Sequence, residues 1–170
     1  MKKLTIILLT LISFTGIAQQ KYAYVDSEYI LKKIPSYEAA QQKLDELSVQ
    51  WQKEIEGYYK EIDKMYKDYQ NDKVLLTEEM KKKRQDDIIK KEKEVKDVQK
   101  KYFGKDGMLY KKRQELIKPI QDEIYNAIKE IATNGNYGIV FDISAGASVL
   151  YTNPKFDISE EVLKKLGYKN

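Results

Sequence analysis

The feature that most constrains this chain is a helical pattern of apolar residues that runs through more than half of it. Along residues 37–69, apolar and aromatic side chains recur at alternating steps of three and four residues, which keeps them on one face of a helix. A narrow apolar stripe of this kind is typical of a coiled-coil seam and needs a partner helix to bury it. The seam residues are Tyr37, Ala40, Leu44, Leu47, Trp51, Ile55, Tyr58, Ile62, Met65 and Tyr69.

The partner helix follows a polar turn at residues 71–77. Thr77 offers a side-chain oxygen as N-cap, and Glu78 and Glu79 place negative charge in the first turn, where the helix dipole favours it. Asn134 and Gly135 supply a left-handed stop. The sequence therefore predicts a long antiparallel helical hairpin, a coiled-coil arm over residues 35–133. The seam residues of its second helix are Met80, Ile88, Val95, Val98, Tyr102, Leu109, Leu116, Ile120, Ile124, Ile128 and Ile131.

Gly104 and Gly107 interrupt the pattern of the second helix. A glycine in a helix interior costs about 1 kcal/mol relative to alanine, so a closely spaced pair weakens the helix locally. Two interpretations follow: a tolerated local loop, or a point of flexure that lets the arm bend.

The two ends of the chain carry strand patterns instead. Residues 22–26 are β-prone, and residues 26–28 are predicted to cap a short helix that Pro35 ends or kinks. The predicted partners of residues 22–26 lie about 115 residues downstream: residues 137–142 and 148–151, which are predicted to form a β-hairpin. Ser159 is predicted to cap a closing helix over residues 160–166. Two or three short strands are marginal unless something packs on them, so several copies are expected to associate. The predicted fold class is mainly α with a small β body, a β-rich oligomerisation base at residues 19–34 and 134–170.

The N-terminus has the features of a secretory signal peptide at residues 1–18. Lys2 and Lys3 precede an apolar run over residues 4–14, and Gly16 and Ala18 are the small residues that a signal peptidase reads. A transmembrane anchor is the alternative, but it needs about 20 apolar residues. Cleavage after Ala18 is predicted to release a soluble protein into an extracytoplasmic space.

Composition excludes several classes of function. Without residues 1–18 the chain has 29 basic against 27 acidic side chains, a balance that does not favour nucleic acid. The chain has no Cys and no His, so thiolate, imidazole and transition-metal chemistry are absent, and no nucleotide-binding glycine motif occurs. Neither a cofactor nor an enzymatic activity is predicted. The carboxylates near the turn fit no oxygen-ligand spacing and are read as helix capping and surface charge: Asp72, Glu78, Glu79, Asp86 and Asp87.

Four segments, in their order along the chain, resemble the Skp/OmpH family of periplasmic chaperones. They are residues 24–31 (YVDSEYIL), 119–128 (PIQDEIYNAI), 134–142 (NGNYGIVFD) and 157–166 (DISEEVLKKL). The resemblance implies a periplasmic homotrimer with three helical arms around a cavity that holds unfolded outer-membrane proteins. The implied function is that of an ATP-independent holdase. A structural coiled-coil scaffold of the cell envelope is the alternative, because a hairpin seam alone is sufficient for it.

Two sets of residues are candidate contact sites. The first is an aromatic and methionine set for apolar clients, since adjacent tyrosines lie about 100° apart on a helix and cannot all face the seam. The second is a basic cluster placed where the helix dipole disfavours cations. It is either a solvated surface or a contact for anionic lipid, lipopolysaccharide or acidic clients. The client set is Tyr58, Tyr59, Met65, Tyr66, Tyr69 and Met80, and the basic cluster is Lys81, Lys82, Lys83 and Arg84.

Overall fold

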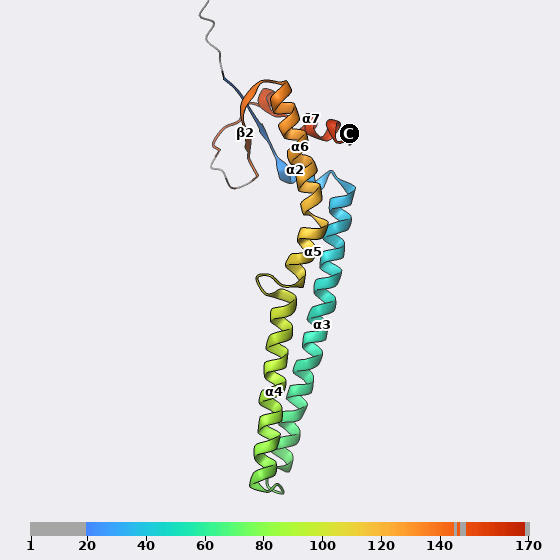
Figure 1. Cartoon of the computed structure of the whole chain (residues 1–170), viewed down its shortest axis with the longest axis vertical. Helices are drawn as coiled ribbons and strands as arrows, with labels where there is room; N and C mark the ends of the chain where they lie inside the picture. Colours follow the sequence, from blue (N-terminus) through green and yellow to red (C-terminus); the bar gives the residue numbers. More distant parts are fainter. Residues whose placement is uncertain (1–19, 145, 147–148, 169–170) are drawn as a thin grey trace, which may run out of the picture. The chain divides into compact units, whose positions relative to one another are not determined.

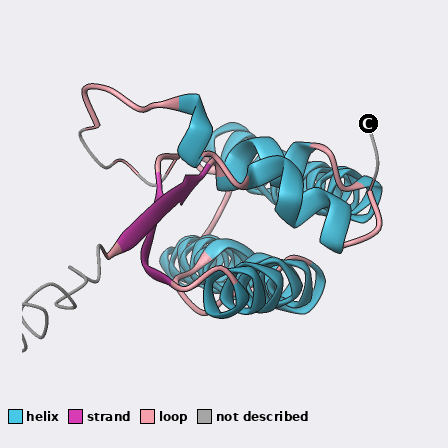
Figure 2. Ribbon diagram, turned by 90° about the horizontal axis from the view of Figure 1, so that it is seen from above, coloured by secondary structure: helices cyan, strands magenta, loops and turns pink. Residues whose placement is uncertain are grey.

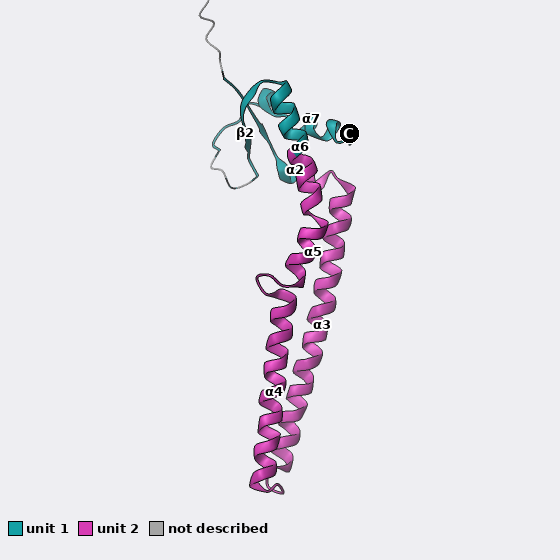
Figure 3. Cartoon of the chain, viewed as in Figure 1, with its two compact units in different colours: residues 1–30, 126–170 teal, residues 31–125 magenta. Residues whose placement is uncertain are grey.

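The computed structural model describes residues 20–144, 146 and 149–168, so the predicted signal peptide lies outside the described residues. Figure 1 gives the element order. The chain divides into two compact units (Figure 3): one contains the chain up to residue 30 and from residue 126, and the other spans residues 31–125. The elements are β1 (Lys21–Val25), α2 (Ser27–Lys32), α3 (Pro35–Asp72), α4 (Glu78–Phe103), α5 (Met108–Leu116), α6 (Lys118–Asn134), β2 (Tyr137–Asp142), η2 (Pro154–Phe156) and α7 (Ser159–Lys165).

The second unit contains the predicted helical hairpin. The unbroken helix α3 packs against α4 and α5, and Pro35 occupies its first turn, where a missing N–H has no cost. Six predicted seam residues of α3 are buried, and the other four are half-buried. The six are Ala40, Leu44, Trp51, Ile55, Ile62 and Tyr69. Their burial confirms the fold class of a mainly α chain with a long helical hairpin.

The centre of the arm is an aromatic cluster around Trp51. The indole ring stacks on the ring of Tyr102 with centroids 4.9 Å apart and planes 3° apart. The ring of Phe103 lies at 78° to the indole in a T-shaped arrangement, with centroids 6.2 Å apart. Tyr102 donates a hydrogen bond from its hydroxyl to the carboxylate of Glu54, at 2.9 Å to one oxygen. This bond and burial next to Glu54 raise the Tyr102 pKa above its ordinary value of 10.0. Ile55, Ile62 and Val95 complete the buried cluster.

The structure has a local loop at Gly104 and Gly107, one of the two interpretations that the sequence leaves open. The helix stops at Phe103, resumes as α5 and continues as α6. Past the break, Ile120, Ile124 and Ile131 are buried as predicted, while Ile117 and Ala127 are buried in place of Leu116 and Ile128. At the far end of α6, the left-handed residue is Asn136 with φ 55°, and not Gly135.

Gly57 offers a clean stability test, since it lies inside α3 and a Cβ there would meet no atom within 4 Å. Replacing Gly57 with Ala should raise the free energy of unfolding by about 1 kcal/mol, because alanine is the better helix former. Urea denaturation followed by circular dichroism measures the change. An unchanged or lower midpoint would contradict the exposed helical position of Gly57.

The first unit is built on a parallel pair of strands from opposite ends of the chain, coloured magenta in Figure 2. Tyr24 pairs with Phe141, and Tyr24 also bridges to Asp157. The predicted β-hairpin is wrong: residues 149–151 form no strand, and Ser148 lies outside the described residues. The predicted pairing of residues 22–26 with residues 137–142 is confirmed, since β1 pairs with β2. The helices α2 to α6 lie between the two strands in the sequence, and parallel strands need such a long connection.

Side-chain caps join the ends of these elements. Asp26 accepts a hydrogen bond from the Tyr29 amide at 2.9 Å, as predicted for an N-cap. The prediction that Ser159 caps α7 is wrong, since Ser159 is the first helical residue. Its hydroxyl accepts from the Asp26 amide at 2.9 Å, and Asp157 accepts from the Ser159 amide at 2.8 Å.

Asp142 links the end of β2 to the start of α2. Partial burial would raise its pKa, but hydrogen bonds from Ser27 and Ser144 outweigh burial and hold the Asp142 pKa below its ordinary value of 3.8. The shortest of these bonds joins the Ser27 hydroxyl to the carboxylate at 2.6 Å. The Ser144 hydroxyl donates at 2.8 Å.

The lowered pKa predicts an acid dependence of stability. A carboxyl group with a lowered folded-state pKa contributes stability that is present above pH 3.8 and is lost as the pH falls through the folded-state value. Replacing Asp142 with Ala should lower the free energy of unfolding by about 1–2 kcal/mol at pH 7 and leave less effect near pH 2. Urea titrations at both pH values measure this, and an equal loss at both would contradict the charged link.

Candidate functional site

The predicted client set does not form one surface. Tyr69 is only 6% exposed, and its hydroxyl accepts a hydrogen bond from Gln85 at 3.0 Å. Tyr58 and Met65 are half-buried, and the Tyr58 ring lies 4.8 Å from the ammonium of Lys91. These side chains fill the seam, which leaves them little area for a partner.

Three members of the set are exposed: Tyr59, Tyr66 and Met80. Tyr59 and Tyr66 are seven residues apart, so they share one side of α3. The Tyr66 hydroxyl donates to Glu92 on α4 at 3.0 Å, and this bond raises the Tyr66 pKa above its ordinary value of 10.0. The bond holds the Tyr66 ring across the two helices while leaving it 43% exposed.

Ile89 adds to this side of the arm and was missed in the sequence. It is 61% exposed and stands three residues before Glu92 on α4, on the same helix side. Its neighbour Ile88 is buried, and two adjacent residues cannot both face the seam. This rule could have predicted from the sequence that one of Ile88 and Ile89 is exposed. We call Tyr59, Tyr66 and Ile89 the aromatic side of the arm.

The basic cluster is only partly neutralised. Lys81 pairs with Glu78 at 2.7 Å, and Arg84 lies 3.9 Å from Asp72. Within the described residues, Lys82 and Lys83 form no ion pair. Thr77 accepts from the Met80 amide at 3.3 Å, which confirms the predicted cap of this helix. Because the cap sets the start of α4 at Glu78, the basic cluster lies in the first two turns of this helix.

The turn before the basic cluster presents two apolar residues to solvent. Val74 is 88% exposed and Leu75 is 83% exposed. We call residues 73–77 the tip. The contact sites predicted from the sequence do not include these two side chains. An apolar pair inside a turn indicates an exposed contact surface and could have identified them. Among the residues that the structure describes, no helix is long and apolar enough to cross a bilayer.

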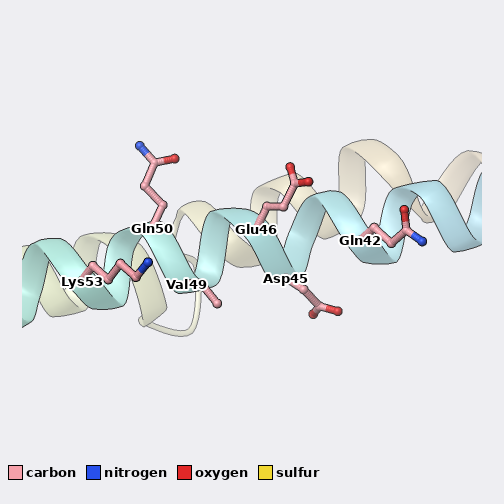
Figure 4. A pocket seen from close by; sticks show the side chains of 6 residues that line it. All are labelled: Gln42, Asp45, Glu46, Val49, Gln50 and Lys53. Atoms are coloured by element: carbon pink, nitrogen blue, oxygen red, sulfur yellow. The ribbon is translucent and has the colours of Figure 1, made fainter.

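A shallow depression on the outer side of α3 has no features of a site. It is lined by Gln42, Asp45, Glu46, Val49, Gln50 and Lys53. Figure 4 shows that these side chains come from one helix and fan outward without converging on a point. Nor does any group of three or more acidic side chains in the described part of the chain stand close enough to hold a metal ion.

The first unit has an apolar pocket of about 280 Å³ on the strand pair. The rings of Tyr22 and Phe156, 4.9 Å apart, form one wall. Beside the pocket, Leu150 is 100% exposed, and its neighbours Val149 and Tyr151 line the pocket. The other lining residues are Ala23, Tyr24, Phe141, Ile143, Thr152 and Asn153. An apolar pocket and a protruding apolar side chain thus lie next to each other in one unit.

Comparison with known proteins places these features in a family. Residues 21–166 match the family model described as outer membrane protein (OmpH-like). The chain is 24% identical over 158 residues to chaperone protein Skp of Yersinia enterocolitica, with 93% of each chain covered. The fold matches the crystal structure of an OmpH-like protein from Caulobacter crescentus with a TM-score of 0.67 and 16% identity, covering 89% of this chain and 86% of that one. The protein therefore belongs to the OmpH-like outer membrane protein family, the family of the Skp chaperone.

Proposed function

We propose that this chain is an ATP-independent holdase of the periplasm that binds unfolded outer-membrane proteins and prevents their aggregation. The observation that carries the proposal is the OmpH-like family match across residues 21–166. Unfolded barrel strands carry alternating apolar side chains that aggregate in water and are satisfied only in a bilayer. A holdase has to separate such chains through many weak contacts, which together give avidity without a tight site.

The aromatic side of the arm supports this function. Tyr59 and Tyr66 expose rigid amphipathic rings, and a ring of this kind contacts many different sequences at low cost in conformational entropy. The hydrogen bond from Tyr66 to Glu92 holds that ring in place before a client arrives. We assign client contact to this side and not to the buried Tyr69.

Self-association through the first unit is part of the proposal. Two strands rarely suffice for a stable sheet, and the pocket on this pair is open and apolar. Leu150 of one copy is suited to fill the pocket of the next copy, a head-to-tail contact that closes into a ring. A homotrimer, the state that the family resemblance implies, would place three arms around one client.

The tip supports a second contact, with an anionic lipid surface of phospholipid or lipopolysaccharide. Lys82 and Lys83 supply positive charge that no acidic side chain in the described part of the chain neutralises, and Val74 and Leu75 supply apolar surface that can enter the headgroup region. This contact would bring a loaded holdase to the membrane that receives its client.

The test of holding is aggregation of an outer-membrane protein diluted from denaturant, followed by light scattering. The wild-type chain without its first 18 residues should suppress scattering. The double variant Tyr59→Ser with Tyr66→Ser should need up to about 30-fold more protein, since the loss of each ring removes roughly 1 kcal/mol of contact. Tyr125→Ser is the matched control, because Tyr125 is 65% exposed on α6.

Full scattering in the presence of the wild-type protein would contradict the holdase and favour a structural scaffold. Equal weakening by Tyr125→Ser would remove the assignment of contact to the aromatic side and leave the holdase in place.

A further inference from the structure

Four residues, Gly104–Gly107, form a small side loop between α4 and α5, visible in Figure 1. The Gly104 amide donates to Lys100 O at 2.9 Å, which ends α4. The Gly107 amide then donates to Gly104 O at 2.8 Å, and the Lys111 amide donates to Gly107 O at 3.0 Å as α5 begins. A hydrogen bond therefore joins the first and the last residue of the loop, as in a tight turn.

The loop is this tight because both ends lack side chains. A Cβ on Gly104 would overlap the carbonyl oxygen of Lys100, and a Cβ on Gly107 would lie 2.8 Å from the carbonyl oxygen of Tyr102. Both residues have negative φ, −63° and −71°, so space and not backbone conformation requires glycine. Any other residue at either position disfavours the loop.

The seam, however, passes through the loop without a change of spacing. Its residues stand seven apart from Ile88 to Leu116, and the step from Tyr102 to Leu109 spans the four loop residues. A continuous helix would therefore also direct Leu109 toward α3. In the looped arrangement, Met108 and Leu109 already pack against the Trp51 cluster. The sequence thus supports two arrangements of the same segment.

We propose that residues 104–107 switch between this side loop and a turn of helix that joins α4 to α5. At 1.5 Å per residue, four added helical residues lengthen the returning side of the hairpin by up to about 6 Å. The unbroken α3 keeps its length, so the arm must bend or slide to absorb the difference. The poor helix propensity of the two glycines holds the loop, and the uninterrupted seam favours the helix. This inference rests on the hairpin alone and holds whether or not the chain is a holdase.

The experiment uses spin labels on cysteines introduced at Asp97 and Arg113, which are exposed and flank the loop. The chain has no cysteine of its own, so only these positions take the label. The double variant Gly104→Ala with Gly107→Ala should raise the ratio of helix to loop by about five-fold per glycine. We expect a longer label distance, by up to about 6 Å, together with a stronger helical circular dichroism signal.

Gly57→Ala is the matched control, because it makes the same change in an unbroken helix with open space around it. It should leave the label distance unchanged. Asp106→Ala, an exposed change inside the loop, favours helix without any overlap and covers the case in which the double variant does not fold. The proposal is overturned if the label distance stays at the wild-type value in Asp106→Ala and in the folded double variant, which would make the loop a fixed joint.

Discussion

Replacing Leu150 with aspartate is expected to convert the self-associated protein into monomers. Leu150 is fully exposed beside an open apolar pocket, so in the proposed ring it fills the pocket of the next copy. Loss of its burial removes about 1.5–3 kcal/mol per contact. A carboxylate left in that pocket without a partner adds a further cost of a few kcal/mol. Because every contact of a ring is changed at once, sedimentation at micromolar concentration should report the mass of one chain.

Leu75→Asp is the control for this result. Leu75 is 83% exposed at the tip and undergoes the same chemical change, but it lies outside the first unit. Its variant should keep the wild-type mass, and circular dichroism should report equal helix content for both variants. A Leu150→Asp protein with the wild-type mass would show that self-association does not run through this side chain.

The hairpin could be predicted because its signal is local. Every step of three or four residues between apolar positions along α3 indicates a helix, so a single polar or glycine residue such as Gly57 does not change the prediction. The cap at Thr77 is equally local, since its partner is the amide of Met80, three residues away. Elements whose stability comes from neighbours in sequence are the ones that a sequence specifies most plainly.

The strand pairing could be predicted only in part, since the pairing of residues 22–26 with residues 137–142 is confirmed and the hairpin is wrong. Residues 148–151 have the composition of a strand and follow β2 closely, so local rules favour a hairpin. The actual partner of β2 is β1, more than a hundred residues earlier, and the parallel pairing depends on how the two ends of the chain meet. Leu150 is then an exposed residue and not a strand residue, and the proposed ring uses it as a contact for the next copy.

The candidate contact residues show the limit of reading one helix at a time. The apolar pattern of one helix predicts which residues face the partner helix. It does not predict how far the partner helix buries the residues on either side of the seam. Tyr69 was grouped with Tyr66, yet Gln85 and the seam enclose Tyr69 while Tyr66 remains open beside Glu92. Separating such neighbours requires the position of α4, which is tertiary information.

Reversing Lys82 and Lys83 to Glu is expected to abolish binding of the protein to anionic vesicles at low salt. Each cation near an anionic surface contributes about 1 kcal/mol, so losing two weakens each tip by about 30-fold before the added repulsion is counted. Lys81 stays in place, because its pairing with Glu78 supports the first turn of α4. Folding and self-association should be unchanged, since surface substitutions usually change stability by less than about 0.5 kcal/mol.

Co-sedimentation with vesicles of anionic and of zwitterionic lipid across a salt series measures this effect. Lys60→Glu with Lys64→Glu is the matched control, since both lysines are exposed on α3 and the change in net charge is the same. At 1 M salt the Debye length falls to about 3 Å, so the fraction bound to vesicles should be the same for variant and wild type. The binding that remains is then due to the apolar side chains of Val74 and Leu75. If the control loses binding as strongly as the tip variant, net charge and not the tip is responsible. If neither loses it, the cluster is a solvated surface that keeps the arm soluble.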